Sequence, residues 1–157
     1  MKIVEYNESN RVMFEKLFEE YFIDELKIDN LAEGEFESIF GSISQHVKEG
    51  ICFLDLLMID GSVKGFINYQ VDSERSNWCI KEGHGCIREL YIMPDFRKFG
   101  YGKELVVHAE KRLMGLSVSA IYLTSEANAT SFWAKMGYRD MDEICARNNQ
   151  PIFEKEV

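Results

Sequence analysis

The apolar residues near the start of the chain recur with the spacing of α-helices. After a strand-forming run at 2–6 (KIVEY), apolar side chains from about Ser9 repeat every three or four residues, which predicts an amphipathic helix capped by Ser9 or Asn10. Its apolar face consists of Phe14, Leu17, Phe18, Tyr21, Phe22 and Leu26. A second helix is expected over about 35–48, ended by Gly50. Its apolar face consists of Phe36, Ile39, Phe40, Ile43 and Val47.

The middle of the chain alternates strand-forming runs with turns. The runs at 51–60 (ICFLDLLMID) and 63–71 (VKGFINYQV) are rich in strand-forming residues and flank Gly61-Ser62, so they predict a hairpin with a two-residue turn. The polar residues 72–85 that follow predict a surface loop. Another strand is expected over 86–93 (CIRELYIM), and Pro94 prevents its simple extension.

The last third of the chain predicts two helices and three strands. A helix is expected from about Gly100 to Met114, with Gly115 as its stop. Its buried face consists of Leu105, Val106, Ala109 and Leu113. The elements expected after it are a strand at 119–125, a helix at about 128–136 closed by Gly137, and strands at about 138–146 and 151–157 around a turn at Asn148-Asn149.

Taken together, these elements have the order βααβββαβαββ. This order predicts an α/β fold with a mixed, mostly antiparallel central sheet flanked by helices. A length of 157 residues fits a single domain over 1–157, and a hydrophobic content of 46% supports a substantial core.

The charge of the chain limits its partners. A net charge of -9 argues against nucleic acid and against anionic membranes, and it favours small cationic or amine-bearing ligands. No apolar stretch reaches the roughly 20 residues that span a bilayer, and no charged leader opens the sequence. Free thiols without a signal peptide predict a cytoplasmic protein.

A metal site is not expected from the cysteines and histidines. The cysteines form no C-x-x-C pair, the histidines show no ligand spacing, and no cysteine is placed as a covalent relay. The residues concerned are Cys52, Cys79, Cys86, Cys145, His46, His84 and His108.

The segment ELYIMPDFRKFGYGKEL, residues 89–105, carries the main chemical signal. A dinucleotide-binding fingerprint would need glycine where the chain has Leu105, and a nucleoside-triphosphate loop would need glycine at Arg97 and serine or threonine at Glu104. Both patterns fail. What remains is Arg-x-x-Gly-x-Gly at a helix start, where converging N–H groups and the helix dipole favour an anion. Gly100 and Gly102 let that anion approach the backbone, although the alternative of a plain solvated turn stays open.

Two segments resemble a known family. LYIMPDFRKFGYGKELV resembles the acetyl-CoA signature of the GNAT superfamily of N-acetyltransferases, and NATSFWAKMGYR resembles a second segment of that family. The resemblance covers nearly the whole chain, with the specific motifs within 86–138. It implies an acyl-CoA-dependent N-acyltransferase that uses acetyl-CoA as co-substrate. The acetyl group would pass to a primary amine of an unidentified acceptor by direct attack in a ternary complex.

The resemblance also implies roles in binding the co-substrate. The pyrophosphate would lie on loop amides with Arg97 beside them, and the pantetheine arm would pair with strand backbone as an added strand. The loop amides are those of Lys98, Phe99, Gly100, Tyr101, Gly102 and Lys103, and the strand positions are Leu90, Tyr91 and Ile92. Asn128 matches an asparagine used near the pantetheine or the reaction centre, with a helix N-cap as the alternative.

For the chemistry, Glu89 resembles the acidic residue that some members use as general base, and an exposed strand glutamate is the alternative. Trp133 stands where many members have a tyrosine that protonates the departing thiolate, and an indole N–H is not acidic enough to do so. Tyr91, Tyr122 and Tyr138 are the possible substitutes. The missing acid leaves a second function open: a CoA-binding sensor or regulatory domain without turnover. An unliganded interaction domain is a third.

Weaker signals concern the acceptor and the assembly. Acidic residues on the first helix would attract a cationic small-molecule or peptide amine, unless they form a solvated face. These residues are Glu19, Glu20, Asp24 and Glu25. His84 is either a base in a loop over the site or an exposed histidine. His108 has no identifiable chemical neighbours, and a homodimer is possible.

Overall fold

The computed structural model of the protein describes residues 1–28 and 30–157. Its strands form a mixed seven-stranded sheet in the order β1-β2-β3-β4-β5-β7-β6. The β4–β5 pair is parallel, whereas β1–β2, β5–β7 and β6–β7 are antiparallel. The elements are β1 (Lys2–Glu5), α1 (Arg11–Asp24), α2 (Glu35–Lys48), β2 (Phe53–Ile59), β3 (Ser62–Val71), β4 (Gly85–Ile92), the 3-10 turn η1 (Pro94–Phe96), α3 (Tyr101–Gly115), β5 (Ala120–Thr124), α4 (Thr130–Lys135), β6 (Arg139–Ile144) and β7 (Pro151–Glu156). The predicted element order and fold class are confirmed.

The chain divides into two compact units. Unit 1 comprises Met1–Asn68 and Glu89–Leu105, and unit 2 comprises Tyr69–Arg88 and Val106–Val157. The two units share β3, β4 and α3, each of which contributes residues to both. The prediction that the chain forms one domain stays a prediction.

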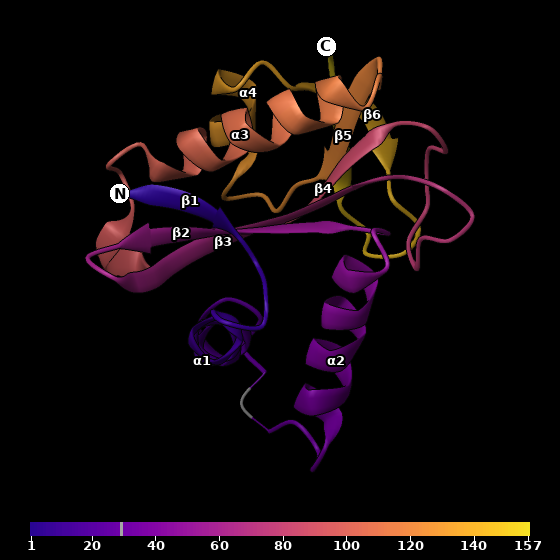
Figure 1. Ribbon diagram of the computed structural model, residues 1–157. Helices are drawn as coiled ribbons and strands as arrows, with labels where there is room; N and C mark the ends of the chain where they lie inside the picture. The colour runs from indigo at the N-terminus through magenta and orange to yellow at the C-terminus, as the bar shows by residue number, and fades with distance from the viewer. Residues whose placement is uncertain (29) are drawn as a thin grey trace. The chain divides into compact units, whose positions relative to one another are not determined.

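In unit 1, α1 and α2 lie on the same side of β1 and β2 (Figure 1). The predicted face of α1 is buried, and its rings pack against one another; the Phe14 ring, for example, lies 5.3 Å from that of Phe18. On α2, Phe40 is fully buried and the other predicted positions are partly buried. Leu26 is a correction: it is 38% exposed, because α1 ends at Asp24 before that face would reach it.

The start of α1 differs from the capping expected of it. Asn10 occupies the N-cap position but makes no side-chain bond to the helix. Its carboxamide instead accepts the N–H of Asn7 at 2.8 Å and donates to the carbonyl of Glu5 at 2.9 Å. Asn10 therefore fixes the connection between β1 and α1 by bonding back to the residues that precede it.

The β2–β3 hairpin is present, with its turn one residue earlier than predicted. Asp60 and Gly61 both have left-handed φ angles, 48° and 77°, and Ser62 is already the first residue of β3. Two left-handed central residues make a type I′ turn, for which Asp-Gly is a favoured pair. The prediction of Gly61-Ser62 was wrong because aspartate tolerates the left-handed region.

In unit 2, α3 packs on β4 and β5 through the predicted face of the helix. Val106, Ala109 and Leu113 are fully buried, and a Cβ added at Gly85 would lie 3.0 Å from side-chain atoms of both Leu113 and Ile121. The small residue therefore permits the close approach of helix and sheet.

The short helix α4 begins later than predicted. Its N-cap is Ala129, so Asn128 lies outside the helix and the N-cap alternative for that asparagine was wrong. Gly137 follows the helix with a φ of 90°, as expected for a left-handed stop. None of the helices in the described residues is long and apolar enough to cross a membrane.

Candidate active site

The glycine loop between β4 and α3 belongs to unit 1 and leaves backbone amides open. Lys98 and Gly100 have left-handed φ angles of 68° and 87°. The carbonyl of Gly100 accepts the N–H of Glu104 at 3.1 Å, so the N–H groups of the first helical residues have no partner one turn earlier. A Cβ added at Gly100 would meet nothing within 4 Å. The loop therefore presents helix-start amides to open space that an anion can enter.

Arg97 holds this loop in place. Its Nε donates to the carbonyl of Ile92 at 2.8 Å, and its guanidinium forms an ion pair with Glu25 next to the end of α1. The guanidinium carbon also lies 5.7 Å from the centre of the Tyr91 ring. Arg97 thus uses its Nε and its Nη2 within the protein, while Lys98 and Lys103 are exposed in the same segment.

β4 pairs with β5 over a short distance before the two strands separate. Their parallel register consists of Gly85 with Ile121 and Cys86 with Tyr122. Within the described part of unit 2, Ile87 and Arg88 continue β4 beyond the last of these pairs. The parallel register of the β4–β5 pair therefore ends at Cys86 and Tyr122 in the described residues.

Glu89 lies on the part of β4 that belongs to unit 1. Its side chain is exposed, and its Oε2 accepts the hydroxyl proton of Tyr21. Tyr21, on α1, is buried, and its ring lies 5.2 Å from that of Tyr91. A solvent-facing carboxylate that a buried hydroxyl orients is a suitable general base. The sequence alone places Tyr21 in the core and does not show this role, because a contact with a residue 68 positions away leaves no local pattern.

Tyr91 has the one tyrosine hydroxyl in the described residues that is buried without a hydrogen-bond partner. Burial, reinforced by the nearby negative charge of Asp24, raises the pKa of Tyr91 to about 12, and Arg97 acts in the opposite direction. The group stays protonated at every physiological pH, so it can act as a donor but not as a base.

Trp133, Tyr138 and Tyr122 belong to unit 2. Trp133 is 6% exposed, and its ring centre lies 5.5 Å from that of Tyr138. The Tyr138 hydroxyl donates to Glu110 at 3.0 Å, and burial followed by the charge of Glu110 raises the pKa of Tyr138. The Tyr122 hydroxyl donates to Asp72, and burial again raises its pKa. Both hydroxyls are therefore bound to carboxylates within the protein.

The other candidate residues are surface groups. Asn128 is exposed. His84 contributes backbone to the turn of its loop, where its carbonyl accepts the N–H of Asp72 at 2.9 Å. On α1, Glu19 and Asp24 are exposed, whereas Glu25 is taken up by Arg97. No three metal-binding side chains are grouped in the described parts of the chain.

Comparison with known proteins identifies the family. The sequence matches the acetyltransferase (GNAT) family over residues 10–138, which is most of its length. The chain belongs to the GNAT family. GNAT acetyltransferases use acetyl-CoA, and membership implies an amine acceptor.

One curated relative is similar to this chain in sequence, and two solved structures are similar to it in fold. An uncharacterised N-acetyltransferase from the pepI 3′ region of Lactobacillus delbrueckii subsp. lactis is 26% identical over 151 residues, covering 91% of this chain and 87% of the relative. A GNAT-family acetyltransferase structure from Staphylococcus aureus Mu50 has a TM-score of 0.76 at 14% identity, covering 99% of this chain and 98% of the other. The PaiA N-acetyltransferase of Thermoplasma acidophilum, solved with coenzyme A, has a TM-score of 0.72 at 17% identity, and both chains are covered completely at 100%.

Proposed function

We propose that the protein transfers an acetyl group from acetyl-CoA to a primary amine by direct attack of the amine in a ternary complex. The observation that carries this proposal is the loop of unit 1, in which Lys98 and Gly100 take left-handed conformations at the start of α3 and a Cβ added at Gly100 would meet nothing within 4 Å. The bound coenzyme A in the Thermoplasma GNAT structure supports the choice of co-substrate.

In this proposal the co-substrate is held mainly by backbone. The pyrophosphate lies on the amides from Lys98 to Lys103, where the helix dipole contributes roughly half a positive charge. The pantetheine arm adds to β4 along Leu90, Tyr91 and Ile92. Arg97 positions the loop through Ile92 and Glu25, and its remaining N–H donors lie beside the pyrophosphate. Asn128, exposed ahead of α4, is available to the pantetheine or the acetyl group.

The chemistry needs one proton acceptor and tolerates a weak proton donor. Glu89 takes the proton of the amine, directly or through a water, as the N–C bond to the acetyl group forms and the C–S bond breaks. A thiol has a pKa near 8.5, so the sulfur can leave as a thiolate. Tyr91 is the proposed donor, because Tyr122 and Tyr138 donate to buried carboxylates and Trp133 has no acidic proton.

The same observations keep a second candidate in view. A CoA-binding regulatory domain without turnover would retain the loop and do without a proton donor, and the engaged hydroxyls of Tyr122 and Tyr138 favour it. Acetyl transfer to a panel of amines separates the two functions. The enzyme releases CoA in an amine-dependent way, whereas the regulatory domain binds acetyl-CoA and releases none.

Calorimetric titration with acetyl-CoA tests the binding site. Wild type is expected to bind at micromolar concentration, and Gly100→Glu is expected to abolish binding by placing a bulky carboxylate over the amides. Gly50→Glu is the matched control, since Gly50 is also left-handed, with a φ of 70°, and a Cβ there also meets nothing within 4 Å. If wild type fails to bind, both candidate functions are wrong.

A further inference from the structure

Two arginines contact one tryptophan in unit 2. Arg88 comes from β4, Arg147 from the connection between β6 and β7, and Trp78 from the loop between β3 and β4. The two guanidinium carbons lie 5.9 Å and 4.7 Å from the centre of the Trp78 ring, within the range of cation–π contacts. Three separate segments therefore bring two positive charges to one aromatic ring.

Neither arginine has a carboxylate partner among the described residues. Arg88 Nη1 donates weakly to Gln70 Oε1 at 3.4 Å, and Arg147 Nη1 donates to the Asn77 carbonyl at 2.9 Å. In a chain with 27 acidic residues, two unpaired guanidinium groups at one ring are unusual. Each guanidinium has five N–H donors, so most of them remain open to a ligand.

A buried polar network fixes Arg88 and Trp78. Gln70 is fully buried and donates from Nε2 to Asp72 Oδ1 and to the Trp78 carbonyl, both at 2.7 Å. Because both donors of this amide are used, its Oε1 is left to accept from Arg88.

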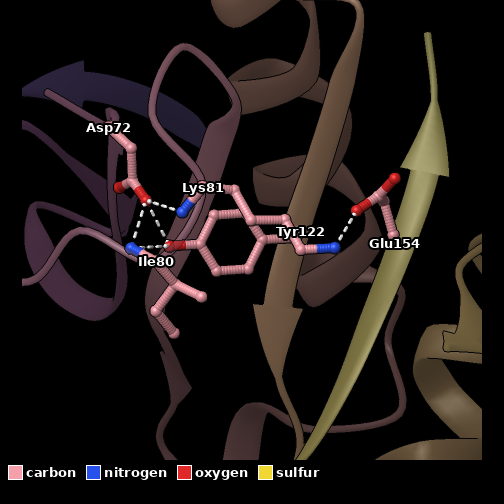
Figure 2. Close-up of polar contacts among 5 residues, drawn as sticks. All are labelled: Asp72, Ile80, Lys81, Tyr122 and Glu154. Atoms are coloured by element: carbon pink, nitrogen blue, oxygen red, sulfur yellow. Dashed lines mark hydrogen bonds and ion pairs between the residues drawn. The ribbon is translucent and has the colours of Figure 1, made fainter. Parts of the chain in front are cut away.

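Asp72 in turn holds the whole loop. Its Oδ2 accepts the Tyr122 hydroxyl and the backbone N–H groups of Ile80 and Lys81, the latter two at 2.9 Å and 3.1 Å (Figure 2). The Lys81 ammonium continues to Glu154 of β7 at 2.5 Å. The tryptophan is thus carried by a loop wrapped around a carboxylate that is 1% exposed.

The segment carrying Arg147 is also held. The N–H of Cys145 donates to the Gln150 carbonyl at 2.8 Å, and Asn148 Nδ2 donates to Thr124 Oγ1 at 2.9 Å. Charged groups held in place before a ligand arrives lose less entropy when they bind it. The fixed positions of the two guanidinium groups therefore favour the binding of a ligand.

Arg88 is the residue immediately before Glu89, the proposed base. Consecutive Cα atoms are about 3.8 Å apart whatever the surrounding structure, so the Arg88 side chain starts from backbone next to that of Glu89. We propose that Arg88, Arg147 and Trp78 bind an oxyanion of the acceptor, a carboxylate or a phosphate. The inference rests on the proposed function, and it defines the acceptor as an amine that also carries an oxyanion, such as an amino acid or an amino phosphate ester. A guanidinium fork matches two oxygens of such a group.

The test compares acceptors that differ in the oxyanion alone. The acetylation assay uses each L-amino acid against its C-terminal amide, and phosphoethanolamine against ethanolamine. Wild type is expected to prefer at least one oxyanion-bearing series, and the preferred series identifies carboxylate or phosphate as the source. Arg88→Gln and Arg147→Gln should each raise the KM of the preferred acceptor about 10- to 100-fold and leave that of its uncharged partner unchanged. The quantity compared between wild type and each variant is the ratio of the KM values for the charged and the uncharged acceptor. The different basicities of the two amines therefore cancel.

Arg75→Gln is the matched control, since Arg75 is an exposed arginine of the same loop and its backbone N–H donates to Ser73 Oγ at 3.3 Å. Equal KM changes for charged and uncharged acceptors would overturn the inference while leaving the acetyltransferase function intact. If acetyl-CoA itself fails to bind, the proposed function is wrong. The oxyanion site is then tested separately by saturation-transfer NMR, on mixtures of each amino acid with its amide and of phosphoethanolamine with ethanolamine. Oxyanion-dependent binding that is lost in Arg88→Gln supports the site, and its absence in wild type overturns it.

Discussion

Glu89 combines an exposed carboxylate with a hydrogen bond from the buried Tyr21. Glu89→Gln keeps the shape of the side chain and removes its ability to accept a proton. We expect the rate to fall by about 10²-fold or more, mainly below the pKa of the amine, where a base is needed. The measurement is kcat/KM against pH. An unchanged profile would remove Glu89 from the mechanism.

Tyr21→Phe provides the matched test of positioning. The phenyl ring keeps its place among the aromatic side chains of unit 1, whereas the hydroxyl that orients Glu89 is lost. A smaller fall in kcat/KM than for Glu89→Gln, with the fold retained, is the expected result. A loss as large as that of Glu89→Gln would instead give Tyr21 a direct role.

The proton donor can be tested at two positions. Tyr91→Phe removes a buried hydroxyl that has no partner among the described residues, so stability should change little while kcat falls about 10²-fold. Trp133→Tyr supplies a phenol where many GNAT members have one, and it should raise kcat if Tyr91 is an inefficient donor. If neither change alters kcat, the thiolate leaves without protonation by the protein.

At the scale of elements, two glycines differ in what a larger residue would do. At one position a Cβ would clash with neighbouring atoms, and at the other it would only raise the helix propensity. A Cβ at Gly65 of β3 would lie 2.6 Å from the Tyr91 carbonyl oxygen and 2.7 Å from Ile92 Cδ1, whereas one at Gly41 of α2 would meet nothing within 4 Å. We expect Gly65→Ala to destabilise the protein by about 2 kcal/mol, and Gly41→Ala to stabilise it by about 0.5–1 kcal/mol. Urea denaturation measures both. Gly65→Ala should also weaken acetyl-CoA binding, because it displaces β4 where the pantetheine would pair.

Elements were easier to predict from the sequence than the contacts that join them. The face of α1 from Phe14 to Phe22 is periodic, and periodicity is local information, so its burial was correctly predicted. Leu26 fitted the same period and was misplaced, since no residue pattern marked the end of the helix at Asp24. Boundary errors of one or two residues, as at Asp60, are of the same kind.

The candidate site shows the same limit more sharply. Its glycine loop was found because an entire anion-binding signal lies in consecutive residues. The contacts of Glu89 with Tyr21, of Arg97 with Glu25, and of Arg88 with Trp78 each join segments that are far apart in the chain or lie in different elements. Such pairs depend on the folded geometry, so a single sequence does not show them.

For the molecule as a whole, several buried thiol and phenol groups should make the free energy of unfolding fall at alkaline pH. Burial, followed by the charge of Asp72, raises the pKa of the Cys86 thiol from 9.0 to about 12, and the pKa values of Tyr122 and Tyr138 are raised as well. The folded protein keeps these protons while the unfolded chain releases them. The stability that these protonated groups contribute is therefore complete below about pH 9. It is lost as the pH rises toward the pKa values of the groups in the folded protein.

The free energy of unfolding should accordingly fall as the pH rises from about 9 to about 12, by about 1.4 kcal/mol per pH unit for each group that is protonated in the folded protein and deprotonated in the unfolded chain. Chemical denaturation at a series of pH values measures this slope. Cys86→Ala removes the buried thiol and should flatten the curve over that interval. An equal slope in Cys86→Ala and wild type would contradict the assignment.

The position of β7 in the sheet has a consequence for how the protein is made. β7 pairs with β5 on one side and with β6 on the other, although it follows both in the chain. Until residues 151–156 have left the ribosome, β5 has no partner on that edge and β6 has no partner in β7. A chain in which β7 has not yet joined the sheet therefore holds two unpaired strand edges, which are prone to aggregation and are targets for chaperones.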